Sequence, residues 1–541
     1  NLLLLLNAHK AIMAHSKQLY IKEVLTSVPH LLEMLDRSPV SRTYGCFDRE
    51  YWHYKAKDFP SGMHEEGVIT LALLYTNNFE GNIYFNTPRI KEYVIAGINF
   101  AITHSHSNGS NDDYYPNEEA LGSTSFSLYA CTEAYLALDL KDDRMENFFK
   151  KRGDFIAKKK ESGTLSNHHA LVGVALHNVF LITKDEQFKK YAEQKIAETL
   201  SYQSPEGLFK EYEGCDPGYL TFTIDFLAKY LQKNPDNTEL KNALEKAIHF
   251  CFLTIHPDGS YGGEYGSRNT HHALPNGFEI LSKYFTEAIF VRNRFLESLE
   301  NKTNSRIDDD RIFHLYTYNH IQAFLNHDES LESQTRNNNY EELFKDAGLL
   351  VHNKNGLFVI CSINKGGVFK AYRGKELITS DCGVLLSKEL GQKITSQVWS
   401  KLEYSKLDDA LTIKSSLYNY SQILPSPFKQ LVFRILTIGL GLKFSKIIRI
   451  ILQKILITSK QPTSTKLERV ISFKQDRVEI TDKIKTPDKD FKNIYIPSDF
   501  TGIYVASSQP YSLSTLLPWE NYIQQVETLN KTGELTIKRS F

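Results

Sequence analysis

The sequence lacks the features that mark several common protein classes. Its 64 Lys and Arg balance 64 Asp and Glu, so no overall positive field predicts nucleic-acid binding. None of its six cysteines form a Cys-x-x-Cys pair, and their spacing fits no zinc site. We therefore expect isolated buried thiols in a reducing compartment, no bound metal and no nucleic-acid partner.

A secretion signal is not recognisable either. Residues 1–10 show neither a basic n-region nor a small-residue cleavage site. We expect a cytoplasmic location, peripheral to the membrane if residues 428–460 bind it, and a periplasmic one if a leader has been removed from the chain.

Apolar residues (41%) and aromatic residues (12%) are abundant enough for packed cores, and 541 residues exceed what one core usually organises. Up to about residue 330, apolar residues recur with a period near 3.6, which predicts helices in a bundle, a repeat array or an α/α toroid. The predicted helices cover 17–35, 64–76, 88–104, 121–140, 169–184, 219–233, 238–255, 277–297 and 311–326.

The pattern changes near residue 340, where short β-branched or alternating segments predict a sandwich of strands. The polar stretch 328–340 is the predicted linker. We therefore predict a helical domain, residues 1–335, and an antiparallel β domain, residues 341–541. The predicted strands cover 349–363, 367–372, 383–386, 410–418, 469–473, 478–484 and 494–505.

Residues 428–460 interrupt the β pattern with seven Lys or Arg, no acidic residue and many apolar residues. The longest uncharged run, Ile435–Leu442, is too short to span a bilayer. The composition fits a basic amphipathic helix pair on an anionic membrane surface. It equally fits a helical insertion that packs on the protein with its cations in solvent.

Ser166-Asn167-His168-His169 stands at the start of an apolar helical segment. Ser166 is expected to cap this helix, which places Asn167 and His168 in its first turn. Free backbone N–H groups and the helix dipole favour an anion there. The alternative is a capped helix with two surface histidines.

Asp216 and Pro217 predict a second helix start, with Asp216 as the cap and Pro217 at the first helical position. Tyr219 then lies in the first turn, where a nearby positive charge favours the phenolate needed for proton transfer. The alternative is a tyrosine that packs beneath a loop.

A glycine-rich loop, 258–272, precedes a further helix start. Its glycines indicate a tightly folded backbone. Arg268 can clamp a carboxylate, and His271 or His272 can act as acid or base.

Together these stretches resemble the heparinase II/III-like polysaccharide lyases, including related alginate lyases. Residues 166–169 are similar to the family's Asn-His stretch, and residues 211–219 resemble the segment with its catalytic Tyr. Residues 44–55 resemble members associated with bacterial surface-polysaccharide production, and 344–349 with 366–383 look like the family's opening strands. The resemblance implies an incomplete α/α toroid followed by an antiparallel β-sandwich, an anionic polysaccharide or oligosaccharide as partner, and no cofactor.

The resemblance also implies roles for residues. Asn167 and His168 would neutralise a uronate carboxylate, and Tyr219 would take the C5 proton or return one to O4. Family members commonly carry a histidine early in the β domain, but residues 362–366 have none, so His271 or His272 is expected to assist. The expected substrate contacts are Tyr115, Glu118, Tyr265 and Arg268.

These roles predict a carbon–oxygen lyase that cleaves a uronic-acid-containing glycan by β-elimination. Reprotonation of the same intermediate from the opposite face would instead give a uronyl C5-epimerase. A toroid glycoside hydrolase would need paired carboxylates, for which Glu118, Asp216 and Glu264 are candidates. A non-catalytic glycan-binding protein is the remaining alternative.

Overall fold

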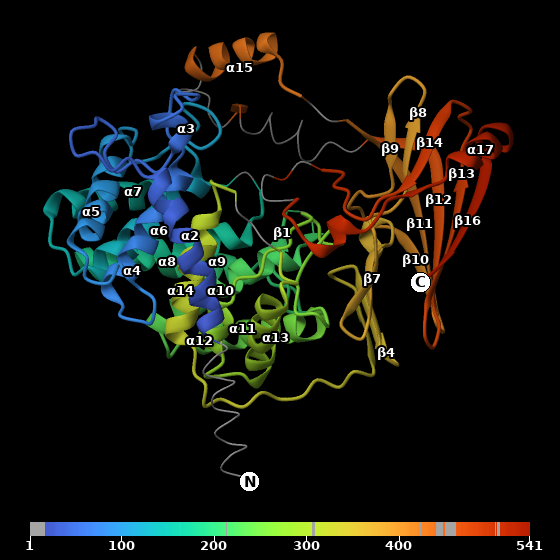
Figure 1. Ribbon diagram of the computed structural model, residues 1–541, viewed down its shortest axis with the longest axis horizontal. Helices are drawn as coiled ribbons and strands as arrows, with labels where there is room; N and C mark the ends of the chain where they lie inside the picture. The colour runs from blue at the N-terminus through green and yellow to red at the C-terminus, as the bar shows by residue number, and fades with distance from the viewer. Residues whose placement is uncertain are drawn as a thin grey trace.

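The computed structural model describes residues 17–161, 163–212, 214–305, 309–421, 424–439, 447–448, 461–503, 505 and 509–541. A ring of helices is followed by two antiparallel sheets, which confirms the predicted toroid and sandwich (Figure 1). The last helix of the ring ends at Asn326 and the first strand of the sheets begins at Tyr340. All six cysteines are buried.

Within the described residues, six helices follow one another around the inside of the ring, and the last of them lies against the first. They are buried along most of their length because outer helices cover them, so they are apolar on nearly all sides. The inner helices are α4 (Gly67–Thr76), α6 (Leu121–Ala137), α8 (Ser166–Thr183), α10 (Pro217–Lys233), α12 (Asn276–Leu281) and α14 (Phe313–Asn326). The outer helices are α2 (Gln18–Met34), α5 (Pro88–Thr103), α7 (Asp143–Lys158), α9 (Glu186–Leu200), α11 (Thr238–Thr254) and α13 (Thr286–Asn301), and the short helices are α3 (Arg49–Trp52) and η1 (Gly62–Glu66).

The sequence pattern missed some boundaries. Helices α7 and α9 were not predicted because their solvent faces are highly charged and only a narrow stripe is buried. The predicted helix 277–297 is two helices, α12 and α13. The predicted strand 349–363 is a hairpin that turns at Asn355 and Gly356, both of which have positive φ.

In the part of the chain that the structure describes, the two sheets contain five and nine strands, and every strand pairing in them is antiparallel. The smaller sheet runs in the order β3 (Tyr340–Phe344), β4 (Leu349–Lys354), β5 (Leu357–Ser362), β6 (Val368–Arg373) and β7 (Glu376–Asp381). The larger runs β15 (Glu520–Asn521), β14 (Phe491–Ile496), β8 (Leu385–Lys388), β9 (Lys393–Thr395), β11 (Ala410–Tyr420), β12 (Pro462–Phe473), β13 (Val478–Lys485) and β16 (Glu534–Ser540), with β10 (Glu403–Leu407) paired to β11. Short elements complete the chain: η2 (Ile363–Lys365), η4 (Leu513–Leu516), η5 (Ile523–Gln525) and α17 (Val526–Thr532).

The smaller sheet is covered on both faces. Leu349 and Val351 pack with the toroid core, while Leu350 between them packs with the larger sheet. This alternation follows from the period of two along a strand. The smaller sheet therefore lies between the toroid and the larger sheet.

A buried arginine fixes the turn between β5 and β6. Arg469 on β12 donates to both carboxylate oxygens of Asp482, at 2.7 and 2.9 Å, and to Asp381 at 2.8 Å. It also donates to the carbonyl oxygen of Gly367 at 3.0 Å. The turn that follows Lys365 is thereby tied to the larger sheet.

The predicted basic insertion is described in part. Helix α15 (Pro427–Gly439) confirms that its first part is helical. Residues 440–446 and 449–460 lie outside the described residues. Over the ranges that the structure describes, no helix is long and apolar enough to cross a membrane.

Candidate functional site

The first predicted stretch lies where α8 meets a hairpin of two short strands, β1 (Lys210–Glu211) and β2 (Gly214–Cys215). Leu165, not Ser166, occupies the N-cap position, so the predicted serine cap is wrong. The Ser166 hydroxyl instead donates to the carbonyl oxygen of Lys210 at 2.6 Å and ties the helix to the hairpin. Asn167 and His168 do lie in the first helical turn.

Asn167 is buried against Glu211, whose side chain has no solvent exposure. One carboxyl oxygen of Glu211 accepts hydrogen bonds from the Asn167 backbone N at 3.0 Å and from Asn167 Nδ2 at 2.8 Å. The other, Oε2, has no hydrogen-bond partner among the described residues. Burial raises the pKa of Glu211 to about 8, so the carboxyl is protonated and uncharged at neutral pH.

The two neighbouring histidines face different surroundings. His168 Nδ1 lies 2.9 Å from Glu161 Oε2, and the imidazole keeps partial exposure. His169 lies 3.5 Å from Glu198, and its pKa is lowered by burial. Of the pair, His168 has the more exposed side chain.

The second predicted stretch folds as expected. Asp216 is the N-cap of α10, and its Oδ1 accepts a hydrogen bond from the Tyr219 backbone N at 3.0 Å. Its Oδ2 accepts from the Arg268 backbone N at 2.8 Å, and its carboxylate also binds the Thr270 hydroxyl. One carboxylate thus holds the start of α10 and the glycine-rich loop together.

Tyr219 lies beside His272, with ring centroids 5.3 Å apart, and stays partly exposed. His272 Nδ1 is hydrogen-bonded to the Tyr316 hydroxyl. Burial lowers the pKa of His272 to about 3 and raises that of Tyr316, so both are uncharged at neutral pH. A Tyr316 hydroxyl that donates to Nδ1 leaves the imidazole proton on Nε2, where it can serve as a neutral donor.

His271 is held apart from this group. Its Nε2 lies 3.0 Å from Glu264 Oε1, and Lys370 on β6 lies 3.0 Å from Glu264 Oε2. Although burial by itself raises the pKa of Glu264, Lys370 and His271 hold it well below its usual range. The resulting buried ion cluster fastens the glycine-rich loop to the smaller sheet.

Arg268 stacks on an aromatic ring. Its guanidinium carbon lies 4.2 Å from the centre of the Tyr212 ring. Its Nε is buried and has no hydrogen-bond partner among the described residues. Arg268 is largely buried, as are most groups around it.

A lysine from the β domain reaches the same loop. Lys365 ends η2 within residues 362–366, and its Nζ donates to the Gly266 carbonyl at 2.5 Å and to the Asn269 side chain. Burial lowers the pKa of Lys365 to about 7. Where the family resemblance predicts a histidine, this chain therefore presents an amine that is readily neutral.

The structure does not gather the remaining predicted substrate contacts here. Tyr265 is fully buried in the core, and its hydroxyl is 2.8 Å from His256 Nε2. Tyr115 is buried with its ring 5.4 Å from Phe433 of α15. Glu118 accepts backbone hydrogen bonds within its own loop. Because Tyr265 is fully buried, it has no surface that a glycan can reach.

Comparison with known proteins places this geometry in context. No protein-family model matches the sequence, and no curated protein does. Among solved structures, a Paenibacillus xanthan lyase aligns with a TM-score of 0.52 and 10% identity, over 89% of this chain and 46% of that chain. The Streptomyces coelicolor A3 chondroitin AC lyase in complex with chondroitin sulphate aligns at 0.55 and 11% identity, over 90% and 67%.

The chain has the fold of these two polysaccharide lyases. It spans about half the length of the xanthan lyase and two thirds of the chondroitin lyase. In this lyase fold the candidate residues lie where the starts of α8 and α10 and the glycine-rich loop meet the smaller sheet.

Several residues of this region were missed from sequence. Glu211 and Tyr316 gain their roles only from burial beside Asn167 and His272, and no local spacing marks them. Trp399 packs so closely on Gly214 that a Cβ there would lie 2.2 Å from the indole. Glycine at the hairpin was a usable signal of close approach, although it could not identify the partner.

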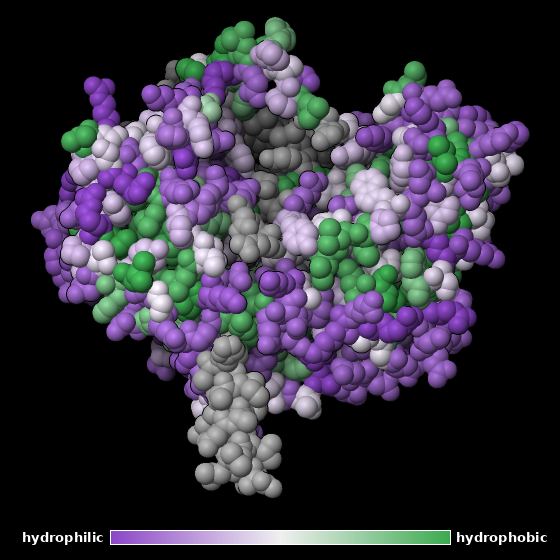
Figure 2. All heavy atoms as spheres, in the orientation of Figure 1, coloured by the Kyte–Doolittle hydropathy of each residue, from purple (hydrophilic) through white to green (hydrophobic). Residues whose placement is uncertain are grey.

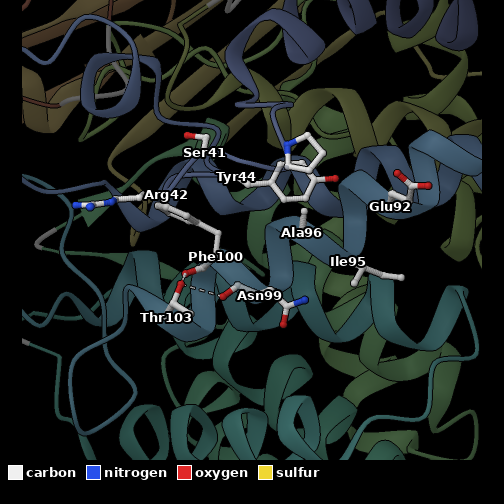
Figure 3. Close-up of a pocket in the computed structure, with 10 residues that line it drawn as sticks. Ser41, Arg42, Tyr44, Glu92, Ile95, Ala96, Asn99, Phe100 and Thr103 are labelled. Atoms are coloured by element: carbon white, nitrogen blue, oxygen red, sulfur yellow. Dashed lines mark hydrogen bonds between the residues drawn. The ribbon is translucent and has the colours of Figure 1, made fainter.

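A separate hollow of about 440 Å³ lies on the outer side of the toroid (Figure 3). Tyr44, Asn99 and Phe100 line it, together with neighbouring residues of α5 and the loop around Ser41. It contains none of the predicted site residues. It is therefore not part of the candidate site.

Proposed function

We propose that the chain is a polysaccharide lyase that cleaves a uronic-acid-containing glycan by β-elimination. The observation that carries this proposal is the pairing of Asn167 with an uncharged Glu211 at the start of α8. The same hairpin leads directly into Asp216 and Tyr219. Neutral donors for a carboxylate and a phenol for the proton therefore belong to one connected structure.

The carboxylate of the sugar would be neutralised by Asn167 and His168, with the charge of Arg268 nearby. Asn167 Nδ2 has two protons, and Glu211 engages one of them. The second can bind the carboxylate as negative charge moves onto it from C5. Fixed donors of this kind stabilise a developing charge without having to reorganise.

The proton transfer falls to Tyr219. In its phenolate form it would accept the C5 proton, and the electron pair left on C5 would form the C4–C5 double bond as the bond to O4 breaks. The phenol so formed can return a proton to O4. His272, neutral and beside the Tyr219 ring, supplies a hydrogen-bond donor to this step.

The named structural neighbours support the choice of reaction. One is a xanthan lyase, and another is a chondroitin AC lyase bound to chondroitin sulphate. A carboxylated glycan is the substrate class that fits the neutral donors at Asn167. The uronic acid and the linkage stay open.

The test incubates the protein with a panel of uronate polysaccharides in D2O. We expect ultraviolet absorbance from a new C4–C5 double bond, with product that carries an unsaturated uronate at its end. Tyr219→Phe should lower the rate by about 10²- to 10⁴-fold, the usual contribution of a general base. Tyr404→Phe, on the exposed strand β10, is the matched control and should keep the wild-type rate.

Three results would count against the proposal. Deuterium at C5 without cleavage would assign the chain to C5 epimerisation. Undiminished cleavage by Tyr219→Phe would remove the phenol from the mechanism. Binding of a glycan without either reaction, across the whole panel, would leave a binding protein.

A further inference from the structure

Helix α15 leaves the sheets and lies on the toroid. It belongs to the connection between β11 and β12, yet Figure 1 shows it at the outer edge of the helical part, above α3. Arg434 Nη2 lies 3.2 Å from Asp58 Oδ1. Asn117 Nδ2 donates to the carbonyl oxygen of Thr437 at 3.2 Å. These contacts, with the packing of Phe433 on Tyr115, hold one side of α15 against the rim of the toroid.

The opposite side of α15 is apolar and uncovered. At 100° per residue, positions 428, 431, 435 and 438 form one stripe, roughly opposite Phe433. Phe428, Leu431, Ile435 and Ile438 are 74%, 58%, 63% and 53% exposed, and Thr437 is the buried residue of the helix. Apolar atoms gather at this edge in Figure 2. An amphipathic helix normally buries such a stripe against the core, whereas α15 exposes it.

The sequence segment that contains this stripe carries charge of one sign. Residues 427–460 contain seven Lys or Arg and no Asp or Glu, in a chain whose net charge is zero. A second copy docked through this stripe by two-fold symmetry would bring the same cationic segment against itself. An anionic surface with an apolar interior complements both the apolar stripe and the positive charge of the segment.

We propose that α15 is an interfacial helix that seats this protein on an anionic lipid membrane. Its apolar stripe enters the boundary between headgroups and acyl chains, and the positive charge of residues 427–460 attracts the lipid phosphates. At thirteen residues the helix is about 20 Å long and lies flat on the surface. The proposal does not depend on the reaction proposed above.

Flotation with vesicles tests it. We expect the protein to float with vesicles of phosphatidylcholine and phosphatidylglycerol in equal parts, and to stay behind with phosphatidylcholine alone. Ile435→Glu should weaken the partitioning roughly tenfold or more, since it replaces an inserted side chain by an anion. Ile83→Glu is the matched control, because Ile83 is 79% exposed in a loop away from α15, and it should bind like the wild type. Lys429→Glu tests the charge on the same helix and should lower binding without removing an apolar residue.

Three outcomes would overturn the proposal. The first is a wild-type protein that the anionic vesicles leave unbound, and the second is Ile435→Glu binding as well as Ile83→Glu does. The third outcome is measured by sedimentation in vesicle-free buffer. A dimer that Ile435→Glu dissociates would show that the stripe is an interface between copies of this chain.

Discussion

Glu211 makes the stability of the protein depend on pH in a direction opposite to that of an ordinary carboxylate. Its pKa is about 8 in the folded protein and near 4.5 in an exposed chain. Between these values the folded state holds a proton that the unfolded state has released, so the free energy of unfolding falls as pH rises. At about 1.4 kcal/mol per pH unit, the whole window amounts to at most roughly 5 kcal/mol.

Glu211→Gln isolates this contribution. Glutamine keeps the carbonyl that accepts from Asn167 N and Nδ2, and it does not titrate. We expect the wild-type protein to lose stability relative to Glu211→Gln, by several kcal/mol, as pH rises from 5 to 8.5. Urea unfolding of both proteins across that range measures the difference. The difference between the two proteins cancels the pH-dependent contributions of other groups. One of these is Glu66, whose pKa burial also raises to about 8.

A second measurement makes the reasoning refutable. The infrared spectrum at neutral pH should contain a protonated-carboxyl band that Glu211→Gln weakens. If the band is unchanged and the stability difference is flat with pH, Glu211 is ionised in the folded protein. The role given to it beside Asn167 would then fail. Glu211→Ala should cost about 1–3 kcal/mol at pH 5, because it leaves buried N–H donors unpaired, and this cost should shrink as pH rises toward 8.5.

Other predictions concern three further buried residues of the β region. Lys365, with a pKa of about 7, is neutral in the folded protein at pH 9 but protonated when unfolded, so its contribution to stability rises with pH. Lys365→Met should lose that rise. If the substitution shifts the unfolding midpoint by the same amount at pH 7 and at pH 9.5, the prediction is wrong. Arg469→Met should lower the free energy of unfolding by about 3–5 kcal/mol, because the buried carboxylates of Asp482 and Asp381 lose their shared partner. A loss under 1 kcal/mol in urea unfolding would refute this. Trp399→Ala should cost about 3–5 kcal/mol and loosen the hairpin at Gly214, seen as faster hydrogen exchange there.

The parts of the site that could be predicted from sequence are those set by local chemistry. Asp216 followed by Pro217 is a helix start whose hydrogen bonds involve only the next few residues, and the structure confirms it. The first-turn position of Asn167 is likewise local. Ser166 shows the limit, because its hydroxyl found a tertiary partner in Lys210 that no spacing reveals.

What could not be predicted depends on burial. Tyr265 has the same local setting as a ligand-binding tyrosine, and only the packed core around it shows that its hydroxyl belongs to His256. Neighbouring histidines present the same difficulty, since His271 and His272 point into different clusters. The charge states of Glu211 and Lys365 also arise from desolvation, which the order of residues does not record.

In the proposed lyase, an uncharged Glu211 would allow a uronate carboxylate to bind at Asn167. A uronate carboxylate roughly 6 Å from an ionised Glu211 would be repelled by about 3 kcal/mol at an effective dielectric constant of 20, or about a hundredfold in binding. We therefore expect kcat/KM of the proposed lyase to fall above pH 8 in the wild-type protein. The ratio of kcat/KM at pH 9 to that at pH 7 should be larger in Glu211→Gln, and unaltered in Glu66→Gln, whose carboxyl is bonded to Tyr318 in the toroid core. Equal ratios in all three proteins would show that the alkaline limb belongs to another group, and the link between the buried proton and substrate charge would be lost.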